Sequence, residues 1–472
     1  MHPFYRAVVA SRIIRPLTLP DSKEIKILGY ADDSTLLVMN DESLLEIGNL
    51  IRKFEKAMAS KLNRNKTKIF ATGSWKGRDR WPIDWCKIEN EYFYTLGIYH
   101  THEYANCLDK NWSTVTESIS KHSSILLKRK LTLHQRAAYA NTCMMSKLWY
   151  IAHIYPLPEA YSKGINKIIF QYIWGGRYEP IKRSTVSKPK SEGGLAIVNC
   201  LFKAKTIMVS TFIKCYTHEE YQNTLMYYYC FMRLNNILPS DYNVHDASPT
   251  TTPYYEIAIS TTRNMIHTPG FPNISNKKIY LSMLTKEKAL VEIQYPTLNW
   301  RRIWDNYLST FIYPSDKEII YKHLHMCLAT NKKLFIMNLI NSSTCEKCTD
   351  GLEQTSLHMF YQCSYIKPLF IWIINCLLNI REFKPLSPIR FIYFDNMYID
   401  SRQKNICNIF LYIYIVTIWK TRKENLRIGN LKNMIIRNLN EYQRFIKHMT
   451  THRFEKISKD FASINIDDMI NF

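Results

Sequence analysis

The sequence is poor in acidic residues, and it has no apolar run long enough to cross a membrane. Asp and Glu total 40 against 63 Lys and Arg in 472 residues, which gives a formal net charge of +23. This imbalance indicates a polyanionic partner. The longest apolar stretch, residues 407–419, is interrupted by Asn408 and Thr417 and is shorter than the ~20 residues that a bilayer requires. We therefore expect a buried helix there and no membrane partner.

A secretory signal is also missing, because the first twenty residues carry scattered arginines and prolines instead of a compact apolar segment. The 12 cysteines are therefore expected to be reduced thiols or metal ligands and not disulfides. Internal repeats and low-complexity tracts are absent. The hydrophobic share of 46% and the charged share of 22% are ordinary for a globular protein of several domains.

The pattern of apolar residues predicts an α+β fold. Residues 25–30 and 34–38 are expected to be strands around an acidic turn, and residues 87–100 a strand hairpin. Between them, Asn40 caps a helix whose apolar face recurs at three- and four-residue steps: Leu44, Ile47, Ile51, Phe54, Met58 and Leu62. Beyond residue 110 the pattern is helical, with a Thr132–Gln135 capping box. A helix over residues 159–174 ends at two glycines, Gly175 and Gly176.

The acidic turn GYADDSTLLV, residues 29–38, contains the first group with a chemical interpretation. Carboxylates held in a tight hairpin can bring two Mg²⁺ ions together, one at a 3′-hydroxyl and one at a triphosphate. Asp32 would then be the principal Mg²⁺ ligand and Asp33 a supporting one. Acidic residues also suit turns for purely structural reasons, so the pair by itself leaves both readings open.

A second group has the spacing of a zinc site. Cys345, Cys348, His358 and Cys363 form the pattern C-x2-C-x9-H-x4-C. The first two cysteines offer two thiolates to one ion, and the histidine and last cysteine can complete a tetrahedron. The nitrogen ligand and the absence of a further cysteine run favour Zn²⁺ over an iron–sulfur cluster.

Several blocks in order resemble the reverse transcriptase of LINE-type (non-LTR) retrotransposons. They are HPFYRAV, YADD, LNRNKTKIF, FYTLGIYH, SKLWYIAHIYPLP, IIFQYIWGG and PKSEGGLAIVN, which cover about residues 1–200, and the later CEKC…HMFYQC. The resemblance implies an RNA-directed DNA polymerase with Asp32 and Asp33 as catalytic Mg²⁺ ligands. It further implies nucleotide or primer contacts for Tyr30, Lys66 and Gly97, with RNA and DNA as template and primer.

The same resemblance implies five regions along the chain. They are a polymerase palm (1–105), a thumb (106–200), a helical connector (201–335), a zinc-binding segment (336–375) and a basic helical C-terminal region (376–472). The resemblance implies that the palm is truncated at its N-terminal side, because residues 1–20 contain no acidic residue and the first acidic residue is Asp21. The upstream metal-binding aspartate of the family is therefore absent, and we expect no polymerisation by this polypeptide alone. A further departure is Gln354, inserted between the Glu and Thr that precede the histidine in relatives.

Three readings remain open at this stage. In the first, the chain is a C-terminal fragment of a LINE-type reverse transcriptase that is inactive by itself and can act with a full-length element protein in trans. Alternatively, it is a non-catalytic nucleic-acid-binding protein derived from such an element. A splicing factor similar to group II intron maturases is disfavoured by the zinc segment and the GGLAI block. The sequence does not decide between nucleus and cytoplasm.

Overall fold

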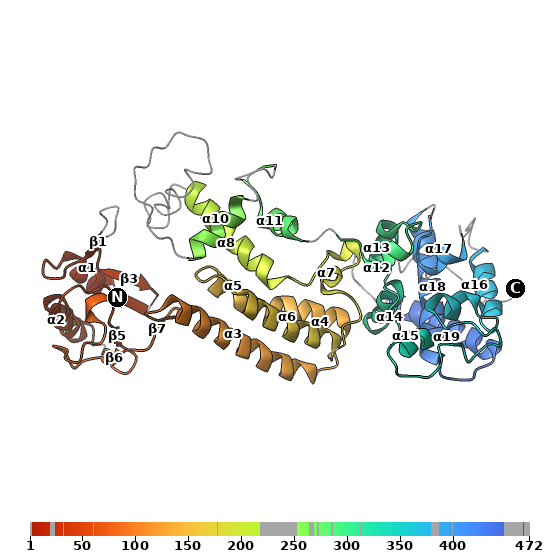
Figure 1. Ribbon diagram of the computed structural model, residues 1–472, viewed down its shortest axis with the longest axis horizontal. Helices are drawn as coiled ribbons and strands as arrows, with labels where there is room; N and C mark the ends of the chain where they lie inside the picture. Colours follow the sequence, from red (N-terminus) through yellow and green to blue (C-terminus); the bar gives the residue numbers. More distant parts are fainter. Residues whose placement is uncertain are drawn as a thin grey trace. The chain divides into compact units, whose positions relative to one another are not determined.

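The computed structural model describes residues 2–18, 24–31, 33–59, 61–176, 178–217, 253–263, 269–270, 273–284, 287–311, 313–378, 387–398, 400–447 and 466. Helices dominate these residues and the named strands are short, so the fold is α+β, as predicted (Figure 1). Two compact units form. The first contains Met1–Ile125, Cys143–Ile168 and Asn199–Met283, and the second contains Leu126–Thr142, Ile169–Val198 and Leu284–Phe472.

The N-terminal part of the first unit holds helices against a hairpin. Its elements are α1 (His2–Ala10), β1 (Leu17–Thr18), β2 (Glu24–Ile25), β3 (Ile27–Tyr30), β4 (Asp33–Leu36) and α2 (Asp41–Met58). The predicted cap of α2 is confirmed, since the Asn40 side chain accepts a hydrogen bond from the Ser43 amide at 3.0 Å. A core of Phe4, Val8, Ile14 and Ile47 joins α1 to α2. This core fixes the hairpin β3–β4 on one side.

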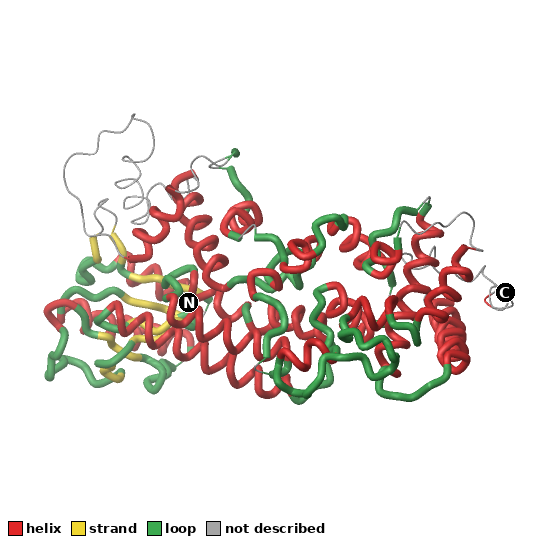
Figure 2. The backbone as a smooth tube through the Cα atoms, turned by 45° about the vertical axis from the view of Figure 1, so that its right-hand side comes forward, coloured by secondary structure: helices red, strands yellow, loops and turns green. Residues whose placement is uncertain are grey.

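Four more strands follow, and they correct one prediction. β7 (Phe93–Thr95) and β8 (Ile98–His100) form an antiparallel hairpin. β6 (Lys87–Glu89), expected in the same hairpin, instead pairs in parallel with β5 (Lys68–Phe70) across the turn η1 (Gly73–Trp75). The Lys87 amide also donates to the Thr67 carbonyl at 3.2 Å. All named strands of the described residues lie within residues 17–100. Figure 2 draws the strands in yellow.

The rest of the first unit is helical. Its elements are α3 (Tyr104–Leu127), the π-helical turn η2 (Ala140–Met144), α5 (Ser146–Ala152), α6 (Glu159–Trp174), α8 (Cys200–Thr217), α10 (Pro253–Arg263) and α11 (Asn276–Met283); α3, η2 and α6 each extend into the second unit. α8 packs against α5, α10 and α11. The fully buried Trp112 of α3 donates its indole N–H to the Pro156 carbonyl at 2.9 Å. α8 thus brings α5, α10 and α11 together, and Trp112 ties α3 to the chain that follows α5.

The second unit is built around one buried helix. Its helices are α4 (Leu133–Tyr139), α7 (Arg183–Val186), η3 (Lys190–Glu192), α12 (Leu290–Gln294), α13 (Trp300–Ser309), α14 (Pro314–Leu324), α15 (Asn331–Ile336), η5 (His358–Gln362), α16 (Lys367–Leu378), α17 (Pro388–Ile392), α18 (Ser401–Thr421) and α19 (Ile428–Lys447). α18 contains residues 407–419 and packs against α14, α16 and α19. The buried helix predicted there is confirmed. Among the described residues, we find no helix that is both long and apolar enough to span a membrane.

A tight glycine turn in the second unit organises its aromatic core. Gly193 has a φ of +80°, and its carbonyl accepts hydrogen bonds from Tyr321 Oη at 3.0 Å and His325 Nε2 at 2.8 Å. Burial lowers the pKa of His325 to about 4, so its ring is neutral at pH 7. A Cβ on Gly193 would lie 2.4 Å from the Trp304 ring. The turn therefore needs glycine for its conformation and for space.

Candidate functional site

The four predicted zinc ligands converge in the second unit. Their ligand atoms all lie within 4.8 Å of one another. Cys345 Sγ is 3.9 Å from Cys363 Sγ, and Cys348 Sγ is 3.4 Å from His358 Nε2. This is the one group of three or more His, Cys, Asp or Glu residues among the described part of the chain whose ligand atoms meet in this way. The sequence spacing therefore predicted a real cluster.

The distances fit one tetrahedral ion. With Zn–S near 2.3 Å and Zn–N near 2.0–2.1 Å, tetrahedral angles give about 3.8 Å between two sulfurs and about 3.6 Å between sulfur and nitrogen. The observed 3.9 Å and 3.4 Å are close to both values. Three thiols and one imidazole are also a usual donor set for structural zinc. The cluster can hold a metal ion and is compatible with zinc.

A short hairpin presents the first two cysteines. Thr344 and Glu353 form an antiparallel bridge, and the Cys345 amide donates to the Leu352 carbonyl at 3.0 Å. Gly351, with a φ of +66°, lies in the loop that returns the chain. This loop holds Cys345 and Cys348 at one end of the hairpin, the arrangement that two ligands of one ion require.

A π-helical turn presents the other two ligands. The Cys363 amide donates to the His358 carbonyl at 2.9 Å, five residues back, which is the hydrogen bond of a π turn. An α-helix would place residues five apart about 500° around the axis, whereas the wider turn allows both side chains to face the same point. Behind them, Tyr414 donates to the Phe360 carbonyl at 2.8 Å from α18. The ligands therefore rest on the buried core of the unit.

Burial sets the protonation of the cluster. His358 is 1% exposed, and desolvation lowers the pKa of its imidazole, which keeps the ring neutral and able to bind a metal. Desolvation raises the pKa of the Cys348 and Cys363 thiols. Thiolates are therefore unfavourable in this place unless a cation balances them. A divalent metal supplies that charge.

The second candidate site is the hairpin β3–β4 of the first unit, which has two different faces. Tyr30 pairs with Asp33, so two residues connect the strands, and Ala31 has a φ of +53°. Gly29 and Ser34 face α1, where Tyr5 Oη lies 2.8 Å from Ser34 Oγ and a Cβ on Gly29 would lie 2.5 Å from the Tyr5 ring. The opposite face carries Leu28, Tyr30 and Asp33, all exposed.

The predicted magnesium pair has no direct support. Asp32 lies outside the described residues, and Asp33 belongs to no convergent group of three or more His, Cys, Asp or Glu among the described ones. Asp33 and Tyr30 do lie opposite each other on the exposed face of the hairpin. Their roles in binding a metal or a primer stay predictions.

Gly97 and Lys66 lie on separate elements of the same unit. Gly97, with a φ of +80°, follows Leu96 in the two-residue turn between β7 and β8. Tyr150 of α5 covers this turn and donates to the Leu96 carbonyl at 2.5 Å. Lys66 is exposed in the turn before β5. Among the described residues, no hydrogen bond or ion pair joins Gly97 or Lys66 to Tyr30 or Asp33.

Sequence reasoning missed the tyrosines that hold both hairpins. Tyr5 and Tyr150 are 29 and 54 residues away from their hairpin partners, so no local pattern marks them. Of the cysteines outside the cluster, Cys143 is half-buried and Cys230 lies outside the described residues. No model of a known protein family matches the chain.

Proposed function

We propose that this chain is part of a LINE-type reverse transcriptase and binds an RNA–DNA template–primer. The observation that carries the proposal is the two-faced hairpin β3–β4. Its inner face packs on α1 through Tyr5, and its outer face presents Tyr30 and Asp33 to solvent. A rigid hairpin that exposes a carboxylate beside an aromatic ring suits a site that meets the end of a nucleic acid strand and its metal ions.

The second hairpin and the charge of the chain support the same proposal. At Gly97 the β7–β8 turn takes a φ of +80°, which glycine favours, and the Tyr150 ring lies 3.4 Å from where a Cβ would stand. Tyr150 holds that turn from the helix α5, as a thumb helix would brace a primer grip. The net charge of +23 provides the electrostatic attraction to phosphates that such binding requires.

In this proposal the metal centre of the second unit is structural. Zinc at Cys345, Cys348, His358 and Cys363 would stabilise this short segment, whose own apolar core is small. Lys347 beside it donates to the Glu424 carbonyl at 2.6 Å and to Asn425 Oδ1 at 2.9 Å. These bonds attach the metal segment to the chain that follows α18. The metal thus holds together a basic region that contacts nucleic acid.

Catalysis by these 472 residues alone is not part of the proposal. Asp32 and Asp33 are two of the three carboxylates that the two-ion scheme uses, and residues 1–20 contain no acid. The loss of one bridging ligand costs orders of magnitude in rate, because the ions supply much of the stabilisation of the transition state. A nucleic-acid-binding protein without catalysis is the second candidate, and this incomplete carboxylate set favours it.

Primer extension tests the inactivity that both candidates expect of this chain. With an RNA template, a DNA primer, dNTPs and Mg²⁺ or Mn²⁺, we expect no product above background from the isolated chain. A complete reverse transcriptase serves as the positive control. Template-dependent incorporation that Asp32→Ala abolishes would show that two carboxylates suffice, and the proposed inactivity would be wrong.

Binding of the template–primer tests the part that both candidates share. We expect a fluorescent RNA–DNA hybrid to bind with an affinity that falls steeply with salt. Lys66→Ala should weaken binding and reduce the slope of log K against log[salt] by about one, because a phosphate contact is lost. Lys68→Ala is the matched control, since Lys68 is already paired with Glu89 at 2.6 Å. Fluorescence anisotropy at several salt concentrations measures the affinity and its salt dependence for both variants. Equal effects of the two variants would show that Lys66 is not part of the binding site.

A further inference from the structure

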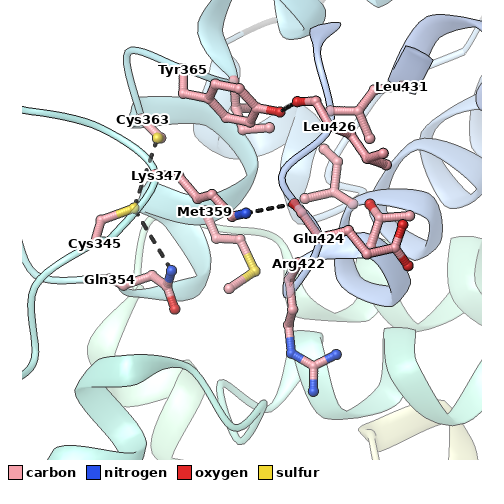
Figure 3. Close-up of a pocket in the computed structure, with 13 residues that line it drawn as sticks. Cys345, Lys347, Gln354, Met359, Cys363, Tyr365, Arg422, Glu424, Leu426 and Leu431 are labelled. Atoms are coloured by element: carbon pink, nitrogen blue, oxygen red, sulfur yellow. Dashed lines mark hydrogen bonds between the residues drawn. The ribbon is translucent and has the colours of Figure 1, made fainter.

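Gln354, the residue that departs from the family pattern, uses all four of its polar groups. Its side-chain amide nitrogen lies 3.7 Å from Cys345 Sγ, and its side-chain oxygen accepts from the Asn331 amide at 3.1 Å. Its backbone N–H donates to the Ser343 carbonyl at 2.8 Å, and its carbonyl accepts from the Lys332 amide at 3.3 Å. One glutamine thus connects a metal ligand to the first turn of α15. Figure 3 shows its amide directed at the Cys345 sulfur.

Further contacts make this connection rigid. The Asn331 side chain donates to the Thr344 carbonyl at 2.9 Å, and Lys332 forms an ion pair with Glu353 at 2.7 Å. The first turn of α15 is therefore attached to both strands of the hairpin that carries Cys345. The side chain of Gln354 is half-buried in this arrangement, so its amide is held toward the sulfur with little freedom to turn away.

A small cavity lies beside the same sulfur. Its lining includes Cys345, Cys363 and Gln354 together with Met359 and Ile418, and it is about 30 Å³ in volume. Lys347 and Arg422 also line this cavity, but among the described residues the side-chain N–H that the structure directs to Cys345 Sγ is that of Gln354. An N–H group that points at a metal-bound thiolate withdraws electron density from the sulfur and stabilises its negative charge.

We propose that Gln354 is a positioning residue of the metal centre: its amide stabilises the Cys345 thiolate and couples metal binding to the order of α15. The inference rests on the proposed zinc site and adds a specific partner outside the four ligands. It has two consequences. Metal affinity depends on the side chain at position 354, and the first turn of α15 becomes protected when metal binds.

The test uses the full chain loaded with Co²⁺, whose sulfur-to-metal charge-transfer bands report the electron density on the thiolates. Gln354→Met retains the size of the side chain and removes the N–H donor. We expect its charge-transfer band to move to longer wavelength, and its metal affinity, measured by chelator competition, to fall about 10- to 100-fold. Gln354→Ala should show the same spectral shift. Hydrogen exchange should show that metal protects Asn331 and Lys332 less in both variants.

Gln362→Ala is the matched control, because Gln362 is an exposed glutamine in the same segment and its loss should leave spectrum and affinity unchanged. A Gln354→Met protein with the wild-type spectrum and affinity would overturn the inference while the metal site stands. Wild-type protein that gives no Co²⁺ charge-transfer band would instead remove the metal site itself, and the inference with it. A loss of affinity without any spectral shift would indicate general unfolding of the loop, and would also contradict the proposed role.

Discussion

Cys345→Ser should release the metal and unfold the segment from Cys345 to Cys363. The segment has a small apolar core of its own, chiefly Met359 and Phe360, and Cys345 contributes one of its four ligands. Binding of structural zinc is worth on the order of 10 kcal/mol to such segments, so the loss of a ligand should remove most of their stability. We expect the zinc content to fall from one ion per chain to none. Calorimetry should show that the segment unfolds at a lower temperature than in the wild-type chain. Excess chelator should have the same effect on the wild-type chain.

Cys86→Ser is the control for this experiment. Cys86 is half-buried in the first unit and is not part of the cluster. Its replacement should leave zinc content unchanged. If chelator and Cys345→Ser alter neither zinc content nor the thermal transition, the metal assignment is wrong.

Gly194→Ala should destabilise the second unit by about 3 kcal/mol or more, at the upper end of what overpacking costs. A Cβ at this position would lie 1.8 Å from the Lys188 carbonyl oxygen and 2.4 Å from its carbon. Both are backbone atoms, so no flexible side chain can yield. The same carbonyl accepts the Ala196 amide at 3.0 Å, and a shift would break that bond too. Urea unfolding should show a lower midpoint with an unchanged m-value.

Gly429→Ala supplies the comparison within the same unit. Gly429 lies in α19, and no atom stands within 4 Å of a Cβ built there. Alanine is favoured over glycine in a helix by about 1 kcal/mol, so this variant should be neutral or slightly more stable. An equal loss of stability in both variants would show that the close approach to Lys188 does not decide the effect.

Local patterns in the sequence predicted several elements well. The helix expected from Asn40 runs over Asp41–Met58, the Thr132–Gln135 capping box is present, and α6 spans Glu159–Trp174 before Gly175 with a φ of +69°. Each depends on residues within one or two turns of one another. The apolar face predicted for α2 runs too far along the chain, since Met58 is 52% exposed and Leu62 lies beyond the helix. The core that joins α1 to α2 does not reach that end of the helix.

Pairings over longer distances could not be predicted in this way. β6 follows β5 after 16 intervening residues and joins it in parallel, although its sequence suited the hairpin with β7 equally well. The contact of Tyr150 with Leu96 and that of Gln354 with Asn331 also join residues that are distant in the chain. A strand or a side chain can be satisfied by several partners, and the three-dimensional packing selects one.

By itself, the sequence determined the helices with strong caps, the two hairpin turns and the four-ligand cluster, because each of these depends on residue type and short spacing. Tertiary structure alone decided which face of β3–β4 is exposed, what lies against each turn, and how the Cys345 sulfur is held. Those outcomes depend on α1, α5 and α15 meeting residues remote in the chain. These long-range contacts depend on how whole helices and strands pack, and a short stretch of sequence does not determine that packing.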